Sequence, residues 1–322
     1  METRRFGDNG MEVGVVGFGT AEIGFEQVAD HTLDAIFGAV FDMGINIIDT
    51  AAMYGDSEEK IGRALRGRRG QCFLCTKCGR CAPRRRSIRG LYERAHRLVQ
   101  YRSMRSVDER ESLDWQPRVL EWNIDQSLRR LGVDCIDIVL LHSCSEETLR
   151  RGAVIEVLHR ARQAGKARYV GYSGDGPAAL YAVQCGQFEV LETSINIADQ
   201  EAIDSTVPLA VRHGMGVIAK RPVANGVWKS DHRPEAVTNH AYWDRLRELQ
   251  YDFLQDGHAF DTALRFTLSV AGVHTAVVGT ANPEHLRRDA ESVAAGILAK
   301  DQFDAIRARW KTVARPDWVG QT

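Results

Sequence analysis

Segments typical of buried strands alternate along this chain with segments typical of amphipathic helices. Strands are expected near residues 13–20, 45–49, 72–77, 136–142, 168–173, 189–195, 216–221 and 275–280. Such alternation predicts an α/β fold with parallel strands, and eight strands suit a closed barrel. The 322 residues are enough for a barrel of about 250 residues with insertions, so we expect a single domain over residues 1–322.

Apolar spacing and capping residues predict the helices between these strands. Leu33, Ile36 and Val40 lie on one helix face, and Gly44 follows as a cap. A second helix should begin at Pro117 and end at Gly132. Further helices are expected near residues 147–164, 177–184, 199–213, 259–270, from about 283, and 301–314.

Both ends of the chain carry additional expectations. The turn Asp8-Asn9-Gly10 predicts an N-terminal hairpin that closes the bottom of the barrel. The C-terminal Pro316-Asp317-Trp318 is expected to fold across the barrel mouth.

Three expected strands end in polar residues, Asp49, Lys77 and His142, and Tyr54 follows the first of them. Barrel enzymes place their chemistry at this end of the strands. A tyrosine has a pKa of about 10, so it becomes a better proton donor when a buried ammonium stabilises its anion. Lys77 would act on Tyr54 in this way, Asp49 would keep Lys77 ionised, and His142 would hold a carbonyl oxygen. The set predicts hydride transfer to a carbonyl with Tyr54 as proton donor.

At these residues the chain resembles the aldo-keto reductase family. The resemblance lies in GINIIDTAAMYGDSEEKIG at 44–62, FLCTK at 73–77 and DIVLLHS at 137–143, and continues through GYSG at 171–174, KRPVANG at 220–226 and VVGTANPEHLRRDAES at 277–292. It implies a (β/α)8 TIM barrel with long βα loops, a catalytic tetrad and a nicotinamide cofactor. The expected activity is the reversible, NADPH-dependent reduction of an aldehyde or ketone to an alcohol.

The expected cofactor contacts follow several strands. Gly19 would let the backbone approach a ligand closely, and the turn from Gly279 to His285 offers free N–H groups to a phosphate. With those implied by the resemblance, the set is Gly19, Thr20, Ser173, Glu192, Arg221, Pro222, Val223, Gly279, Ala281, His285, Arg288 and Asp289. We expect NADP in preference to NAD, and NAD stays open.

Some positions depart from the family pattern. Ser173-Gly174 stands where most members have Ser-Asn, Glu192 where they have Gln, and Ile195 where many stack a Tyr on the nicotinamide. Near the adenine, Arg288-Asp289 replaces Glu-Asn, and His285 replaces Arg or Gln. These changes leave cofactor preference and affinity open.

Residues 78–116 form an unusually long inserted loop. From Arg80 to Arg105 inclusive it holds nine arginines and one acid, Glu93. One interpretation is a lid that recruits an anionic substrate. We favour a solvated helix or an oligomer contact, because charge runs are usually solvated faces.

Cys72, Cys75, Cys78 and Cys81 have a spacing that also occurs at metal sites. A strand over residues 72–77 would turn Cys72 and Cys75 to opposite faces, so we expect no metal. A thiol redox protein built on this array stays an alternative. We expect Cys144 to be an exposed thiol.

A net charge of −1 gives no reason to expect nucleic acid or a membrane as a partner. We expect a small-molecule carbonyl substrate and a cytoplasmic location, and oligomeric state stays open. An alternative is a regulatory subunit that senses nicotinamide redox state, as in the potassium-channel β subunits.

Overall fold

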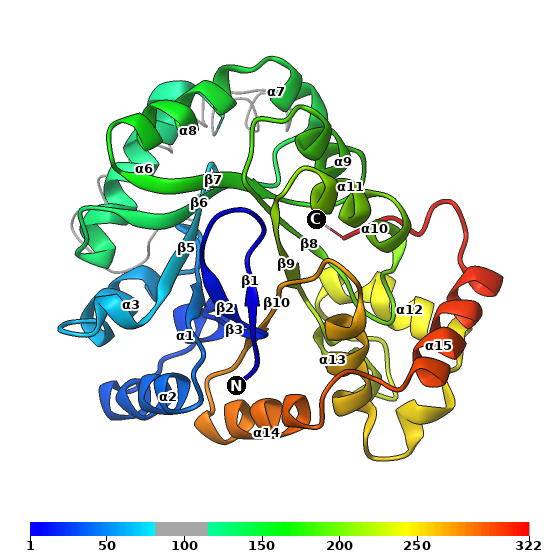
Figure 1. Ribbon diagram of the computed structural model, residues 1–322. Helices are drawn as coiled ribbons and strands as arrows, with labels where there is room; N and C mark the ends of the chain where they lie inside the picture. Colours follow the sequence, from blue (N-terminus) through cyan, green and yellow to red (C-terminus); the bar gives the residue numbers. More distant parts are fainter. Residues whose placement is uncertain (81–114, 322) are drawn as a thin grey trace.

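Eight parallel strands close into a barrel in the order β10-β3-β4-β5-β6-β7-β8-β9. The computed structural model describes residues 1–80 and 115–321 (Figure 1). The barrel strands are β3 Val16–Gly19, β4 Ile47–Asp49, β5 Phe73–Cys78, β6 Ile136–His142, β7 Ala167–Ser173, β8 Val190–Ser194, β9 Gly216–Lys220 and β10 Thr275–Gly279. The predicted (β/α)8 TIM barrel is confirmed. The first strand is shorter than predicted, because the residues before Val16 pair elsewhere.

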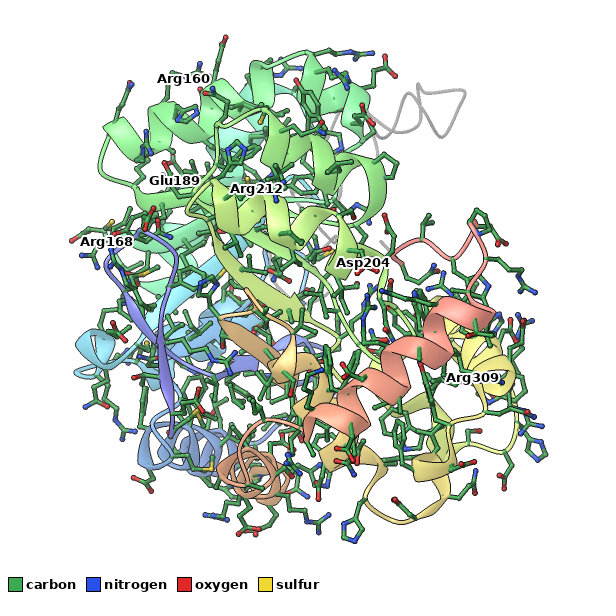
Figure 2. All side chains as sticks on the ribbon, turned by 45° about the vertical axis from the view of Figure 1, so that its right-hand side comes forward. Arg160, Arg168, Glu189, Asp204, Arg212 and Arg309 are labelled. Carbon is green, nitrogen blue, oxygen red and sulfur yellow. The ribbon has the colours of Figure 1, made fainter. Side chains whose placement is uncertain are left out.

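Helices cover the outside of the barrel (Figure 1). They are α1 Ala21–Phe25, α2 Asp30–Asp42, α3 Ser57–Ala64, α6 Pro117–Leu131, α7 Glu146–Arg150, α8 Ala153–Gln163, α9 Gly176–Gln184, α10 Glu201–Asp204, α11 Thr206–Arg212, α12 His240–Leu249, α13 Ala259–Ser269, α14 Pro283–Ala294 and α15 Lys300–Val313, with the 3-10 turns η1 Arg69–Gln71, η2 Ala224–Lys229, η3 Val237–Asn239 and η4 Asp252–Gln255. Figure 2 shows charged side chains such as Arg160 and Arg309 on this outer layer.

Two predicted helices are each divided in the structure. The helix expected over 147–164 breaks at Gly152, whose φ of 78° is left-handed. The helix expected over 199–213 breaks at Ser205 into α10 and α11. The predicted ends of α6 are confirmed, since Pro117 lies in its first turn and Gly132 closes it in the left-handed region. Helix α12 was not predicted.

The N-terminal hairpin closes one end of the barrel, as predicted. Strand β1, Thr3–Arg5, pairs antiparallel with β2, Glu12–Gly14. Phe6, Met11 and Val13 pack against the apolar side chains inside the barrel. A Cβ at Gly216 would lie 2.3 Å from the Phe6 ring, so only glycine at this position leaves space for Phe6. Figure 1 shows the hairpin across the near end of the barrel.

The alternation of side chains along each strand positions the polar residues. Ile47, Cys75, Leu140 and Val190 belong to the apolar cluster inside the barrel. Side chains two residues further on share that face, because the strand period is two. Asp49, Lys77, His142 and Glu192 are those residues, so they meet at the carboxyl end of the barrel.

A second apolar cluster lies beside the barrel, where Tyr242 and Leu246 of α12 pack with Trp310 of α15 and Trp318 of the tail. Trp318 is 5% exposed, and its ring centroid lies 5.4 Å from that of Trp310. Within residues 1–80 and 115–321, no helix has the length and apolar character needed to cross a membrane.

Candidate active site

Lys77 is the centre of a buried polar cluster. Its Nζ donates to both carboxylate oxygens of Asp49, each at 2.6 Å, and to the Thr50 carbonyl oxygen at 3.2 Å. Glu192 Oε2 lies 3.2 Å from the same ammonium. Burial alone would lower the pKa of Lys77, but these carboxylates outweigh burial and hold it well above its usual value. Lys77 is therefore a permanent cation within the barrel.

Tyr54 lies on the loop after β4, beside this cation. Lys77 Nζ is 5.3 Å from the centroid of the Tyr54 ring. The pKa of Tyr54 is raised to about 12 by burial, while Lys77 acts to lower it. Lys77 thus acts in the predicted direction, but the net shift is upward because burial is the larger effect. At neutral pH Tyr54 carries its proton.

His142 faces Tyr54 across the cluster. The two rings meet edge to face, with centroids 5.9 Å apart. Burial, followed by the charge of Lys77, holds the pKa of His142 well below 6.5, so its ring is neutral at neutral pH. Nδ1 of this ring is buried and has no hydrogen-bond partner within the described part of the chain. A buried polar atom without a partner is costly, and a bound ligand would satisfy it.

Three of the expected cofactor residues lie at or directly after the ends of β3 and β7. Gly19 and Ser173 end β3 and β7 beside Asp49 and His142, respectively. Thr20 Oγ1 donates to the Asp49 carbonyl oxygen at 2.8 Å and accepts from Ser57 Oγ at 2.7 Å. Thr20 therefore fixes the end of β4, a role that sequence reasoning missed.

The loop after β9 holds Arg221, Pro222 and Val223, and its backbone is unusual. Arg221, Ala224 and Asn225 have φ values of 53°, 44° and 55°. Ser143, directly after His142, has a φ of 62°. Left-handed conformations at residues other than glycine cost free energy and concentrate at functional sites. Their location at two strand ends agrees with a site at this end of the barrel.

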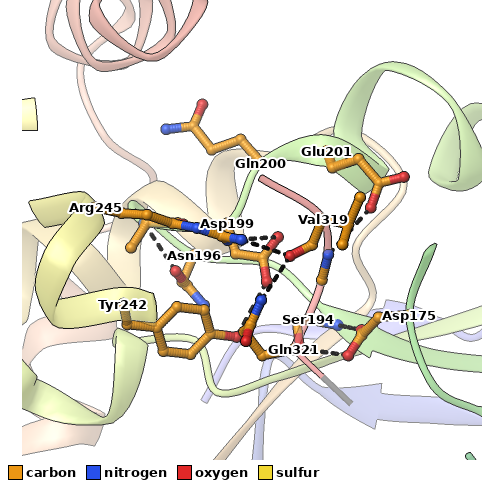
Figure 3. A network of polar contacts seen from close by, with 12 residues as sticks. Asp175, Ser194, Asn196, Asp199, Gln200, Glu201, Tyr242, Arg245, Val319 and Gln321 are labelled. Carbon is orange, nitrogen blue, oxygen red and sulfur yellow. Dashed lines mark hydrogen bonds and ion pairs between the residues drawn. The ribbon is translucent and has the colours of Figure 1, made fainter. Parts of the chain in front are cut away.

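The end of the C-terminal tail, residues 319–321, lies beside Asp175 (Figure 3), whereas Trp318, which was expected to fold across the barrel mouth, packs in the second apolar cluster. Arg245 Nη2 donates to the Val319 carbonyl oxygen at 2.7 Å, and Arg221 donates to the Gln321 carbonyl oxygen. Gly320 lies against Asp175, whose Cβ would be 2.3 Å from a Cβ added there.

Beneath the tail, Asp175 accepts hydrogen bonds from Ser194 and pairs with Lys220 at 3.0 Å. Sequence reasoning missed Asp175, because its partners come from three different segments. Together these contacts hold residues 319–321 near Asp175, which follows β7, and near Arg221, which follows β9.

The turn before α14 is the expected phosphate site. Asn282 caps this helix by accepting from the Glu284 N–H at 3.0 Å, and Thr280 Oγ1 accepts from the Asn282 N–H at 3.1 Å. Burial raises the pKa of Asp289 to about 7, while Lys229 and Arg288 act to lower it. Two cations thus lie near this turn.

Glu22 is a feature of this turn that sequence reasoning missed. A Cβ at Gly279 would lie 2.1 Å from Glu22 Oε2, a buried atom without a hydrogen-bond partner in the described residues. Burial raises the pKa of Glu22. A carboxylate here is unfavourable for a phosphate at Gly279 itself. The unpartnered His142 Nδ1 and the cations Arg221, Lys229 and Arg288 fit an anionic cofactor that reaches from the floor of the site to α14.

The cysteines Cys72, Cys75 and Cys144 are all buried. Cys75 packs inside the barrel and Cys72 in the outer core, on opposite faces as predicted. Cys81 and most of the 78–116 loop lie outside the described residues. The expectation that Cys144 is exposed is wrong, since it is 2% exposed and belongs to the outer core.

Comparison with known proteins gives a consistent result. The model of the aldo/keto reductase family matches residues 15–311. The uncharacterized oxidoreductase YqkF of Bacillus subtilis is 24% identical over 97% of each chain. The aldo-keto reductase AKR11C1 of Bacillus halodurans, holo form, superimposes with a TM-score of 0.77 at 24% identity, covering 99% of each chain. A Klebsiella pneumoniae aldo-keto reductase in complex with NADPH gives 0.67 at 20% identity, covering 98% of this chain and 96% of that one.

Proposed function

Because the chain belongs to the aldo/keto reductase family, we propose that it is an NADPH-dependent oxidoreductase that reduces an aldehyde or ketone to an alcohol, reversibly. One observation carries the proposal: the Asp49–Lys77 pair, Tyr54 and His142 meet at the carboxyl end of the barrel. A bound nicotinamide would supply the hydride that forms the new C–H bond at the carbonyl carbon.

The side chains would handle the proton and the oxygen. The neutral His142 ring donates a hydrogen bond to the carbonyl oxygen and orients it. Tyr54 then gives its hydroxyl proton to that oxygen as negative charge develops on it. Lys77 stabilises the resulting phenolate, and Asp49 keeps Lys77 in place. The phenolate afterwards takes a proton from solvent, and alcohol oxidation runs the same steps in reverse.

The cofactor would lie along the rim from the tetrad to α14. We propose that Ser173, Glu192 and the Arg221-Pro222-Val223 segment hold its nicotinamide half. The rest of the cofactor would lie against Gly19, Thr20, Gly279, Ala281, His285, Arg288 and Asp289, with its phosphates toward Arg288 and away from the Glu22 carboxylate beside Gly279. NADP is favoured over NAD because Lys229 and Arg288 supply positive charge near the start of α14. The NADPH complex of the Klebsiella relative supports the same choice.

The test is NADPH oxidation with a panel of aldehydes, ketones, pyridoxal and keto sugars. Wild type is compared with Tyr54→Phe, and NADPH with NADH, while cofactor binding is followed by fluorescence. We expect turnover of some carbonyl compounds and its loss in Tyr54→Phe, with binding retained. NADPH binding with no Tyr54-dependent turnover on any substrate would reject the reductase and favour a nicotinamide-sensing subunit.

A further inference from the structure

One ammonium faces two carboxylates at the floor of the site. Lys77 Nζ lies 2.6 Å from both Asp49 oxygens and 3.2 Å from Glu192 Oε2. Glu192 ends β8 with only 2% of its surface exposed, and its Oε2 makes no hydrogen bond within the described residues. Because Asp49 already neutralises Lys77, an ionised Glu192 leaves this buried cluster with one net negative charge.

Besides Asp49 and Lys77, the charged group that acts most on Glu192 is Lys220, while Arg221 acts on the neighbouring Tyr54 and His142. Lys220 of β9 is paired with Asp175 at 3.0 Å. Burial holds the pKa of the Cys75 thiol on β5 well above 9.0, so it is neutral. His142 of β6 and Tyr54 are also neutral at pH 7. The facing position on β7 is Ser173, which has no charge.

We propose that Glu192 gives the cofactor site a preference for the oxidised, cationic nicotinamide over the reduced, neutral one. This inference rests on the proposed function. Hydride transfer requires the nicotinamide ring to lie in contact with a carbonyl group held by Tyr54 and His142. A ring in that position is close to the net negative cluster, where water screens charge poorly. The phosphates and riboses are the same in both redox forms, so their contribution cancels in the comparison.

The preference depends on pH. Burial and the neighbouring Asp49 raise the pKa of Glu192 to about 7, while Lys77 and Lys220 act to lower it. Above this pH Glu192 is ionised, so affinity for the cationic nicotinamide rises with pH relative to affinity for the neutral form. By linkage, binding of NADP+ near pH 7 should release a proton from Glu192.

The test measures the dissociation constants of NADP+ and NADPH by calorimetry at pH 6 and pH 8. In wild type the ratio of the NADPH constant to the NADP+ constant should rise at least about five-fold between the two pH values. In Glu192→Gln the ratio should be about five-fold lower than wild type at pH 8, with no pH dependence. Glu201→Gln, which removes a carboxylate that bonds the tail at Gly320, should keep the wild-type ratio.

Each outcome is decisive. An unchanged ratio at pH 8 in Glu192→Gln would overturn the inference while leaving the proposed function intact. Failure of wild type to bind either cofactor would reject the proposed function and this inference with it. If Glu192→Gln does not fold, calorimetry of the wild type at pH 7 in two buffers of different ionisation enthalpy measures the protons released on cofactor binding. Proton release with NADP+ and not with NADPH supports the inference, and equal release overturns it.

Discussion

Gly24 of α1 is in backbone contact with Tyr54. A Cβ added to Gly24 would lie 2.1 Å from the Tyr54 carbonyl oxygen and 2.8 Å from Ser57 Cβ. The Asp56 N–H also donates to the Gly24 carbonyl oxygen at 3.3 Å. The loop that carries the proposed proton donor is therefore fixed against a helix that follows another strand.

Gly24→Ala should displace Tyr54, because the nearest contact of the added Cβ is the Tyr54 carbonyl oxygen, a backbone atom that cannot move away alone. We expect at least about a hundred-fold loss of kcat/KM, since small errors in the position of a reacting group are costly. NADPH affinity should change much less. Gly38→Ala is the matched control, because nothing lies within 4 Å of its added Cβ in α2. A fully active Gly24→Ala enzyme would contradict the role of this contact.

Lys77→Met should lower the stability of the fold. It leaves Asp49 and Glu192 buried without their cation, which should lower the free energy of unfolding by about 3 to 5 kcal/mol. Urea denaturation measures this change. Lys300→Met removes an exposed lysine paired with Asp304 and should leave the free energy of unfolding nearly unchanged. Equal effects of the two substitutions would show that the buried pair is unimportant.

His142 should stay neutral at pH 6.5, where a free histidine is half protonated. The folded protein holds the pKa of His142 well below 6.5, whereas the unfolded chain protonates this ring near 6.5. Its contribution therefore destabilises the fold as pH falls below about 6.5. NMR should show no titration of its ring signal, identified by its loss in His142→Gln. A midpoint near 6.5 would mean that the ring is not buried as described.

Trp318→Ala should loosen the tail from the second apolar cluster. The substitution removes the contact with Trp310 and the stacking of Arg245, whose guanidinium carbon is 5.5 Å from the Trp318 ring. We expect the free energy of unfolding to fall by about 3 kcal/mol, the lower end of the range for replacing a buried tryptophan by alanine. Trp122, which is 42% exposed, provides the control substitution Trp122→Ala. Faster proteolysis of the tail in Trp318→Ala, but not in Trp122→Ala, would support the role of Trp318 in holding the tail to this cluster.

The barrel was predictable because the patterns that specify its strands lie within short segments of the sequence. Apolar runs mark the strands, and the polar residues that end them lie two positions after interior residues, so Asp49, Lys77 and His142 had to meet. The hairpin and the caps of α6 were readable for the same reason, since turn and cap residues act on their own neighbours.

Other features depended on partners far apart in the sequence. The burial of Cys144, the Gly24 contact and the approach of Glu22 to Gly279 each join separate segments. The upward shift of the Tyr54 pKa follows from the surroundings of the ring, which no spacing rule reports. Gly24 was nevertheless a signal, because a glycine inside a helix often marks a close backbone contact.

Transfer of deuterium from NADPH labelled at the transferring position of C4 tests the central claim most directly. One turnover of a carbonyl substrate found with the panel would be followed in wild type and in Tyr54→Phe. We predict deuterium at the carbonyl carbon of the alcohol with wild type, and none with Tyr54→Phe although the cofactor still binds. Equal transfer by Tyr54→Phe would contradict the account, because the proton would then come from another group.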